Sequence, residues 1–97
     1  MEMIKNYQDL VKQIEQIAHR YFTFLSKKHR HTSNSIYYLN KVLNAYIPLS
    51  SIHKLVINND FFFNDYPYWW TNKFTEEEYN SLKYQSMICF LNNYLNA

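Results

Sequence analysis

Residues 60–71 of the chain, with the sequence DFFFNDYPYWWT, decide the predicted fold. They contain two aromatic runs, residues 60–63 and 68–71, of the kind that favours β-strands. The residues between the runs, 64–67, have the composition of a turn, and Pro67 has no N–H to donate to a strand ladder. The pattern therefore predicts a β-hairpin with a four-residue loop. We expect it to pack against other elements, because an isolated hairpin is only marginally stable.

The residues before this stretch predict three helices. Apolar side chains at alternating spacings of three and four residues predict a first helix over about residues 6–27. A second helix is expected to end before Pro48, which pushes its predecessor out of the helical region. The apolar stripe of this second helix comprises Ile36, Leu39, Leu43, Tyr46 and Ile47. A short third helix is expected to begin at a Ser50 or Ser51 cap and to end at the asparagines 58–59.

The residues after the aromatic stretch predict a last helix that runs nearly to residue 97. Thr75 and Glu78 have the spacing of a capping box, and apolar residues from Leu82 to Leu95 supply a buried stripe. The predicted fold class is therefore mainly α with one β-hairpin, in the order helix, helix-turn-helix, hairpin, C-terminal helix. With 97 residues, the chain is expected to form a single domain, residues 1–97.

The composition argues against several classes of protein. The chain has no glycine, which phosphate-binding loops and dinucleotide-binding turns need where the backbone approaches the ligand. No apolar stretch approaches the length of a membrane span, and the start of the chain does not resemble a signal peptide. A single cysteine, Cys89, fits a reducing compartment, so we expect a cytoplasmic protein without membrane association.

No catalytic or metal-binding constellation can be assembled from the spacing of the polar residues. His29 and His31 lie two residues apart, which would point their rings to different sides of a helix. The three glutamates at 76–78 suit the positive end of a helix dipole. We therefore expect a protein that is not an enzyme and that has no cofactor and no metal site.

The distribution of charge predicts a nucleic-acid surface. Residues 1–58 carry eight basic against three acidic residues, whereas residues 59–97 carry two against five. Cations can neutralise phosphates, and exposed aromatic rings can stack on bases. The predicted nucleic-acid-binding residues are Lys27, Lys28, Arg30, Lys41, His53 and Lys54. The aromatic residues expected to stack on bases or to bind a protein partner are Phe62, Tyr66, Tyr68, Trp69 and Trp70. Alternatively, the cations at 27–31 are there because a helix dipole favours them at its C-terminus.

The predicted order of elements resembles that of winged-helix domains, and residues 36–55 with the hairpin at 60–71 carry the resemblance. A winged helix implies nucleic-acid binding, with the third helix in the major groove and the hairpin on the backbone. In size and composition, and in its Tyr/Lys-rich helix followed by an aromatic hairpin, the chain is also similar to small accessory proteins of Gram-positive mobile elements. These are encoded beside A-family polymerases in staphylococcal cassette elements. This resemblance implies a protein partner such as a polymerase or primase.

We therefore expect a non-catalytic accessory protein of a mobile element or phage, acting in DNA replication. It would bind nucleic acid, with the single-stranded form favoured, or a replication or priming enzyme, or both, as a monomer or homodimer. The alternative is a protein-interaction module, such as an immunity or inhibitor protein, that binds no nucleic acid. Residues 73–78 and the apolar helix after them resemble the last helix of bacteriocin immunity proteins, which are four-helix bundles.

Overall fold

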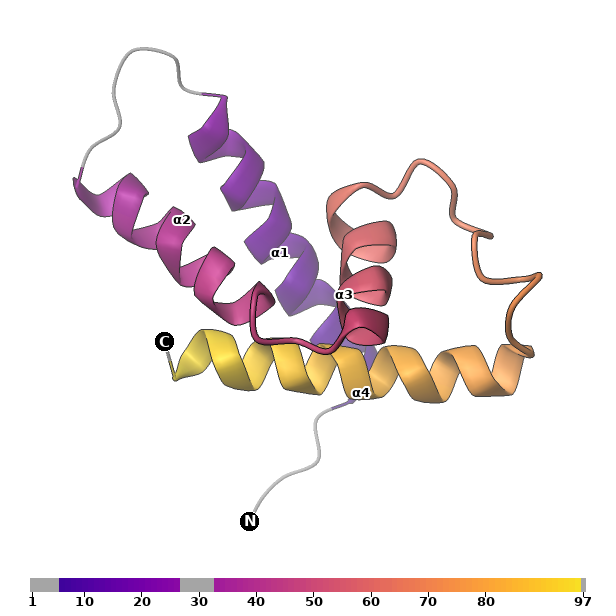
Figure 1. Cartoon of the computed structure of the whole chain (residues 1–97). Helices are drawn as coiled ribbons and strands as arrows, with labels where there is room; N and C mark the ends of the chain where they lie inside the picture. The colour runs from indigo at the N-terminus through magenta and orange to yellow at the C-terminus, as the bar shows by residue number, and fades with distance from the viewer. Residues whose placement is uncertain (1–5, 27–32, 97) are drawn as a thin grey trace.

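The computed structural model describes residues 6–26 and 33–96 (Figure 1). These residues form four α-helices and one π-helical turn, and they contain no β-strand. In chain order the elements are α1 (Tyr7–Leu25), α2 (Ser33–Tyr46), α3 (Ser51–Ile57), the π-helical turn η1 (Asn58–Phe62) and α4 (Glu76–Leu95). α4 lies along the base of the molecule in Figure 1 and contacts the other three α-helices. The mainly α class predicted from the sequence is confirmed.

The hairpin predicted for residues 60–71 is wrong. Helical hydrogen bonding continues beyond α3, because the N–H of Phe63 donates to the carbonyl oxygen of Asn58 at 2.7 Å, which is the pattern of a π-helical turn. Residues 66–74 then form a series of short turns. Aromatic side chains favour strands because strands offer them a half-buried surface. In this chain aromatic side chains of the stretch find a half-buried surface on α1 and α4 instead. With no hairpin there is no wing, so the winged-helix architecture is also wrong.

The helix ends that depend on local capping agree with the sequence predictions. Asn6 caps α1 by accepting a hydrogen bond from the N–H of Gln8 at 2.7 Å. The capping box of α4 is complete, since Thr75 and Glu78 each accept a hydrogen bond from the backbone of the other. Ser50 caps α3 as expected. α3 ends at Ile57 with Asn58 as its C-cap, as predicted, and the chain then winds on into η1.

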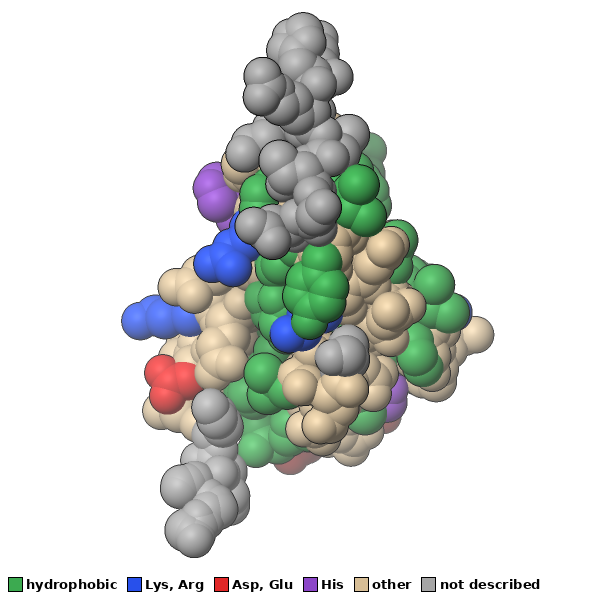
Figure 2. Space-filling model, turned by 90° about the vertical axis from the view of Figure 1, so that its left-hand side faces the viewer, with side chains coloured by type: hydrophobic (Ala, Val, Ile, Leu, Met, Phe, Trp, Pro, Cys, Tyr) green, Lys and Arg blue, Asp and Glu red, His purple; other side chains and the backbone are tan. Residues whose placement is uncertain are grey.

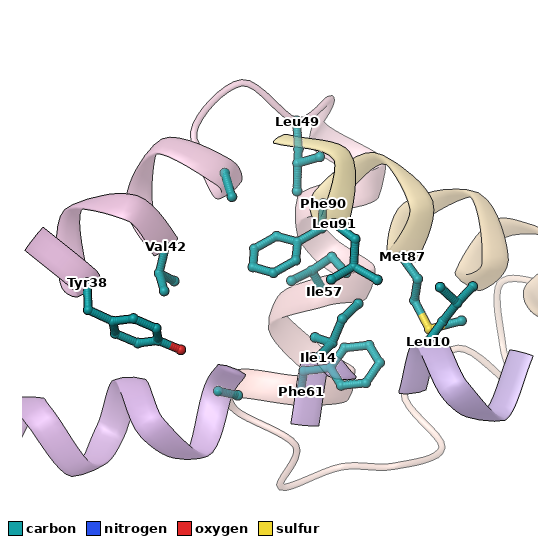
Figure 3. Close-up of a cluster of buried hydrophobic side chains, with 12 residues drawn as sticks. Leu10, Ile14, Tyr38, Val42, Leu49, Ile57, Phe61, Met87, Phe90 and Leu91 are labelled. Atoms are coloured by element: carbon teal, nitrogen blue, oxygen red, sulfur yellow. The ribbon is translucent and has the colours of Figure 1, made fainter. Parts of the chain in front are cut away.

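The hydrophobic core lies where α1, α2, α3 and η1 meet α4. Figure 3 shows side chains from these elements converging, with Phe90 and Met87 of α4 near Ile14 of α1 and Ile57 of α3. These four side chains are fully buried. A hydrogen bond from the side chain of Asn93 to the carbonyl oxygen of Ala45 (3.1 Å) fixes the end of α2 on α4. Burial of this cluster is the main stabilising term for the fold.

α2 buries a different stripe from the one predicted. The buried residues are Ser35, Tyr38, Val42 and Ala45, which lie one position away from the predicted apolar stripe. One position on a helix is a rotation of about 100°. As a result Ile36, Leu43 and Ile47 are 47%, 40% and 60% exposed. The small side chains of Ser35 and Ala45 allow close packing on this side of α2, which explains why the less hydrophobic stripe faces the core.

Candidate protein-binding groove

An apolar groove of about 290 Å³ lies between α1, α2 and η1. Its described lining comes from the last turns of α1, the last turns of α2, and η1 with the residue after it. The lining residues are Tyr21, Phe22, Leu25, Val42, Leu43, Tyr46, Asn58, Phe62 and Phe63. Apart from two tyrosine hydroxyls and the amide of Asn58, these side chains are hydrocarbon. The groove can therefore hold apolar groups but offers little to orient a polar ligand.

Three consecutive phenylalanines at the end of η1 give the groove its floor and one side of its rim. Phe61 is buried in the core, Phe62 is half-buried in the groove, and Phe63 is 59% exposed. The π-helical turn places them in these different environments, although they follow one another in sequence. Such turns occur frequently at functional sites.

Contacts between aromatic rings hold the floor in place. The ring of Phe62 packs edge-on against Tyr21 and Phe90, with centroid separations of 5.6 and 6.2 Å. Phe22 packs against both Phe62 and Phe63, at 6.0 and 5.8 Å. Because Phe90 is fully buried in the core, this network ties the groove to the most rigid part of the molecule. The groove is therefore formed before any ligand binds.

The rim of the groove carries aliphatic side chains that the fold leaves open to solvent. Leu25 of α1 is 47% exposed and faces Leu43 of α2 across the groove lining. Ile36 and Ile47 extend the exposed apolar surface along α2 in both directions from Leu43. Contiguous exposed apolar surface marks interaction sites in soluble proteins. The sequence pattern identified this stripe but assigned it to the core.

The groove lies in a part of the chain without carboxylates. The sequence has no Asp or Glu from residue 16 to residue 59. Among the described cations of this region, Lys54 places its Nζ 5.8 Å from the ring centre of Tyr46, a groove residue, and Arg20 lies over Tyr38. Figure 2, viewed from the side of α2, shows hydrophobic side chains over much of this face, with Lys and Arg at the left and an acidic side chain near them. The described groove lining is thus apolar, and Lys54 is a cation in contact with one of its residues.

The structure places the predicted nucleic-acid-binding residues as follows. Lys27, Lys28 and Arg30 lie outside the described residues. Lys41 is half-buried, with its Nζ 4.7 Å from the ring centre of Tyr94. His53 and Lys54 lie half-buried on α3.

The predicted aromatic residues have three different environments. Phe62 forms the groove floor, and Tyr66 and Tyr68 are 78% and 75% exposed on the loop before α4. Trp69 and Trp70 pack against the protein itself. The Nε1–H of Trp69 donates to Oδ1 of Asp60 at 2.8 Å. Trp70 stacks on Tyr79 at a centroid separation of 4.2 Å and an interplanar angle of 6°.

Lys41 and Trp70, a predicted cation and a predicted tryptophan, lie far apart in the structure. Lys41 packs on Tyr94, and Trp70 packs on Tyr79, so the two contacts lie fifteen residues apart along α4. At 1.5 Å per residue this is a separation of about 22 Å. Figure 1 shows the same separation, with α2 and the loop before α4 at opposite ends of α4.

Asp60 organises a polar cluster that sequence reasoning missed. Its Oδ1 accepts the hydrogen bond from Trp69, its Oδ2 accepts one from the hydroxyl of Tyr79, and Nζ of Lys83 lies 3.7 Å from Oδ2. The Asp60 side chain is only 6% exposed. Burial raises the pKa of Tyr79, and the hydrogen bond to Asp60 raises this pKa further. The sequence offered one signal for this cluster, which is that the acidic residue Asp60 stands at the start of an aromatic run.

Lys83 completes this cluster from within a cage of aromatic rings. Its Nζ lies 5.9, 5.2 and 5.8 Å from the ring centres of Tyr7, Phe61 and Tyr79. Burial raises the pKa of Tyr7, and the nearby carboxylate of Asp60 acts in the same direction. The cluster joins α1, η1, the loop and α4, so it holds the fold together. Its carboxylate is already engaged by Trp69, Tyr79 and Lys83.

The remaining surface offers no comparable site among the described residues. Two other hollows are each lined by described residues of one helix, from Lys12 to Thr23 on α1 and from Glu77 to Gln85 on α4. No group of three His, Cys, Asp or Glu side chains within residues 6–26 and 33–96 could hold a metal ion. In the same ranges, no helix is long and apolar enough to cross a bilayer. Comparison with protein-family models, with curated proteins and with solved structures finds no match.

Proposed function

We propose that this chain is a non-catalytic protein-interaction module, and that the groove between α1, α2 and η1 receives an apolar segment of a protein partner. The observation that carries the proposal is the preformed apolar groove with exposed Leu25, Leu43 and Phe63 at its rim. Full burial of such a side chain contributes roughly 1.5–3 kcal/mol, and these partly exposed side chains forgo only part of it. A partner that covers the rim would recover part of this free energy.

The size and chemistry of the groove favour a protein segment over a small molecule. Sites for drug-sized ligands enclose about 300–1,000 Å³ and contain several polar groups that fix orientation. The groove has a volume of about 290 Å³, and the polar side-chain groups of its described lining are two tyrosine hydroxyls and the amide of Asn58. It fits a few apolar side chains presented by a larger partner.

The same features favour a protein partner over nucleic acid. Bases bind single-strand-binding proteins by stacking on the faces of exposed rings beside cations. In this chain Trp69 and Trp70 are engaged with Asp60 and Tyr79, and the groove rim includes the aliphatic side chains of Leu25 and Leu43. Nucleic-acid binding stays a prediction, and titration with labelled single- and double-stranded DNA at two salt concentrations tests it.

Site-specific cross-linking in cells that produce the chain tests the proposed function. A photo-reactive amino acid replaces Leu43 in one variant and Gln85, on the exposed side of α4, in a control variant. We expect position 43 to yield a discrete protein adduct that position 85 does not yield. Mass spectrometry of the adduct identifies both the partner and the peptide in contact.

Binding of the purified partner then provides the quantitative test. Leu43→Asp should weaken binding at least tenfold, because it places a charge in the apolar groove. Leu95→Asp is the matched control, since Leu95 is exposed near the C-terminal end of α4 and lies outside the groove lining. Equal affinity of the two variants, or equal cross-linking at positions 43 and 85, would contradict the proposal.

A further inference from the structure

We infer that the segment bound in the groove is an acidic amphipathic α-helix of the partner protein. This inference rests on the proposed function and specifies its ligand. Three features of the structure support it: the nature of the groove walls, the absence of carboxylates in the surrounding sequence, and the composition of the other exposed helix faces.

The groove walls favour a helix because they cannot pair with an extended backbone. α1, α2 and η1 present side chains to the groove, and their own backbone groups are engaged in helical hydrogen bonds. No β-strand in residues 6–26 or 33–96 offers an edge for strand addition. An extended segment would bury N–H and C=O groups without partners, which costs free energy. A helix pairs its backbone groups internally and presents only side chains to the groove.

The shape of the apolar surface also matches a helix. Leu43 of α2 and Ile47, the residue after α2, are four residues apart and are both exposed, with Leu25 and Phe63 on the other walls of the groove. A helix that lies in such a groove inserts side chains at positions i, i+3 or i+4, and i+7. We therefore expect the partner segment to carry two or three large apolar residues at this spacing.

The charges around the groove favour an acidic partner. Lys54 contacts the groove residue Tyr46, and Arg20 of α1 lies outside the groove lining, over Tyr38. No carboxylate occurs between residues 16 and 59 to offset them. Asp60, which follows, is already paired with Lys83, and the exposed Asp65 is the next acidic residue. Glutamates or aspartates on the polar face of the bound helix would therefore meet cations at the edge of the groove.

No helix in residues 6–26 or 33–96 supplies a suitable acidic apolar face. The exposed faces of α1 and α4 are polar, as shown by Lys12, Gln16 and Thr23 on α1 and by Glu77, Ser81 and Gln85 on α4. The exposed apolar face of α2 has no carboxylate, so two copies that met through it would bring cations together. Residues 27–32, KKHRHT, contain no aliphatic or aromatic hydrocarbon side chain that could fill the groove.

Selection from a peptide library displayed on yeast tests this inference without assuming a partner. Random peptides of about 18 residues, long enough for five helical turns, are selected on the purified full chain. Counter-selection on the Leu43→Asp variant removes peptides that bind elsewhere. We expect the enriched peptides to be net negative, to carry large apolar residues at i, i+3 or i+4, and i+7, and to lack proline.

Charge-reversal variants test the electrostatic part with one synthetic peptide from the selection. Lys54→Glu should weaken its binding about threefold to fivefold, the effect of a partly exposed ion pair. Lys73→Glu, at an exposed position outside the groove lining, should leave binding unchanged. High salt should weaken binding to the original chain and should reduce the difference between the two variants.

The possible outcomes separate this inference from the proposed function. Enriched peptides that are basic, proline-rich or extended, yet need Leu43, would overturn the inference and leave the proposed function standing. An enrichment that does not depend on Leu43, or no enrichment at all, would contradict both. Dimerisation of the chain that is lost in Leu43→Asp, measured by light scattering, would assign the groove to a second copy and overturn the inference.

Discussion

Asp60 has the most demanding environment of any acidic residue in the described part of the chain. Its carboxylate is nearly enclosed and is satisfied by Trp69, Tyr79 and Lys83 from the loop and α4. An enclosed carboxylate is tolerated only with such partners, because removal of a charge from water is costly. The same contacts fasten the loop before α4, which carries Tyr66 and Tyr68, to the helices.

Neutralisation of Asp60 is predicted to destabilise the fold strongly. Asp60→Asn should lower the free energy of unfolding by about 3 kcal/mol, because it leaves Lys83 largely enclosed without its counter-charge. Asp65→Asn is the matched control: Asp65 is exposed, so the expected change stays within about 0.5 kcal/mol. Urea denaturation measures both changes. Equal stability of the two variants would show that the Asp60 cluster contributes nothing to the fold.

The tyrosines of the core predict a loss of stability in alkali. Burial raises the pKa of Tyr79 above its ordinary value near 10, with a further contribution from Asp60, and the pKa of Tyr38 and of Tyr7 is also raised chiefly by burial. The folded chain therefore keeps these phenols protonated at a pH where the unfolded chain loses their protons. Stability is complete below about pH 10 and falls above it.

Tyr79→Phe should make this alkaline loss of stability less steep, because it removes one phenol whose pKa is raised in the folded chain. Urea denaturation at a series of pH values around and above 10 measures the slope. Tyr68→Phe changes an exposed phenol and should leave the slope as it is in the original chain. If Tyr79→Phe and the original chain lose stability with the same slope, the environment assigned to Tyr79 is wrong.

At the scale of elements, local signals predicted helices well and failed where the decision depended on packing. Asn6 and the pair Thr75 and Glu78 determine helix starts through bonds within one turn, so the sequence alone was sufficient. Residues 60–71 have the composition of strands, but the rings that pack on the protein do so individually, with Phe62 against α1 and Trp70 against α4. Such long-range burial cannot be read from a local pattern.

α2 shows how a correct pattern can lead to a wrong site. The sequence correctly predicted an amphipathic helix, but its more hydrophobic stripe faces solvent, and the stripe with Tyr38 and Val42 faces the core. The groove was missed for this reason, since its rim residue Leu43 had been assigned to the interior. Phe62, which the sequence predicted as a site residue, lies in this candidate groove, although it reaches the groove from η1 and not from a strand.

A pair of neighbouring substitutions tests this orientation of α2. Val42→Ala should lower the free energy of unfolding by about 2 kcal/mol, because it leaves a cavity in the core. Leu43→Ala should lower it by less than about 1 kcal/mol, although it removes more hydrocarbon, because Leu43 is partly exposed. Denaturation by urea compares the two. A larger loss of stability for Leu43→Ala than for Val42→Ala would mean that the stripe predicted from the sequence faces the core.

At the scale of the whole molecule, the two ends of α4 differ in chemistry. The groove is formed by α1, α2 and η1, and the carboxylate-free stretch from residue 16 to residue 59 includes most of α1 and all of α2 and α3. Glu76, Glu77, Glu78 and the exposed Asp65 lie at or near the start of α4, beside the loop. This asymmetry gives the molecule one basic apolar side, and a partner with the opposite charge would approach that side first.

The most direct test of the central claim is NMR mapping of a selected peptide on the isotope-labelled chain. We predict intermolecular contacts from the peptide's apolar side chains to the methyl groups of Leu25 and Leu43 and to the ring of Phe63. The backbone N–H signal of Gln85, on the exposed side of α4 and outside the groove lining, should not move. Contacts that instead fall on Tyr66 and Tyr68, or on the polar face of α1, would contradict the assignment of the groove as the binding site.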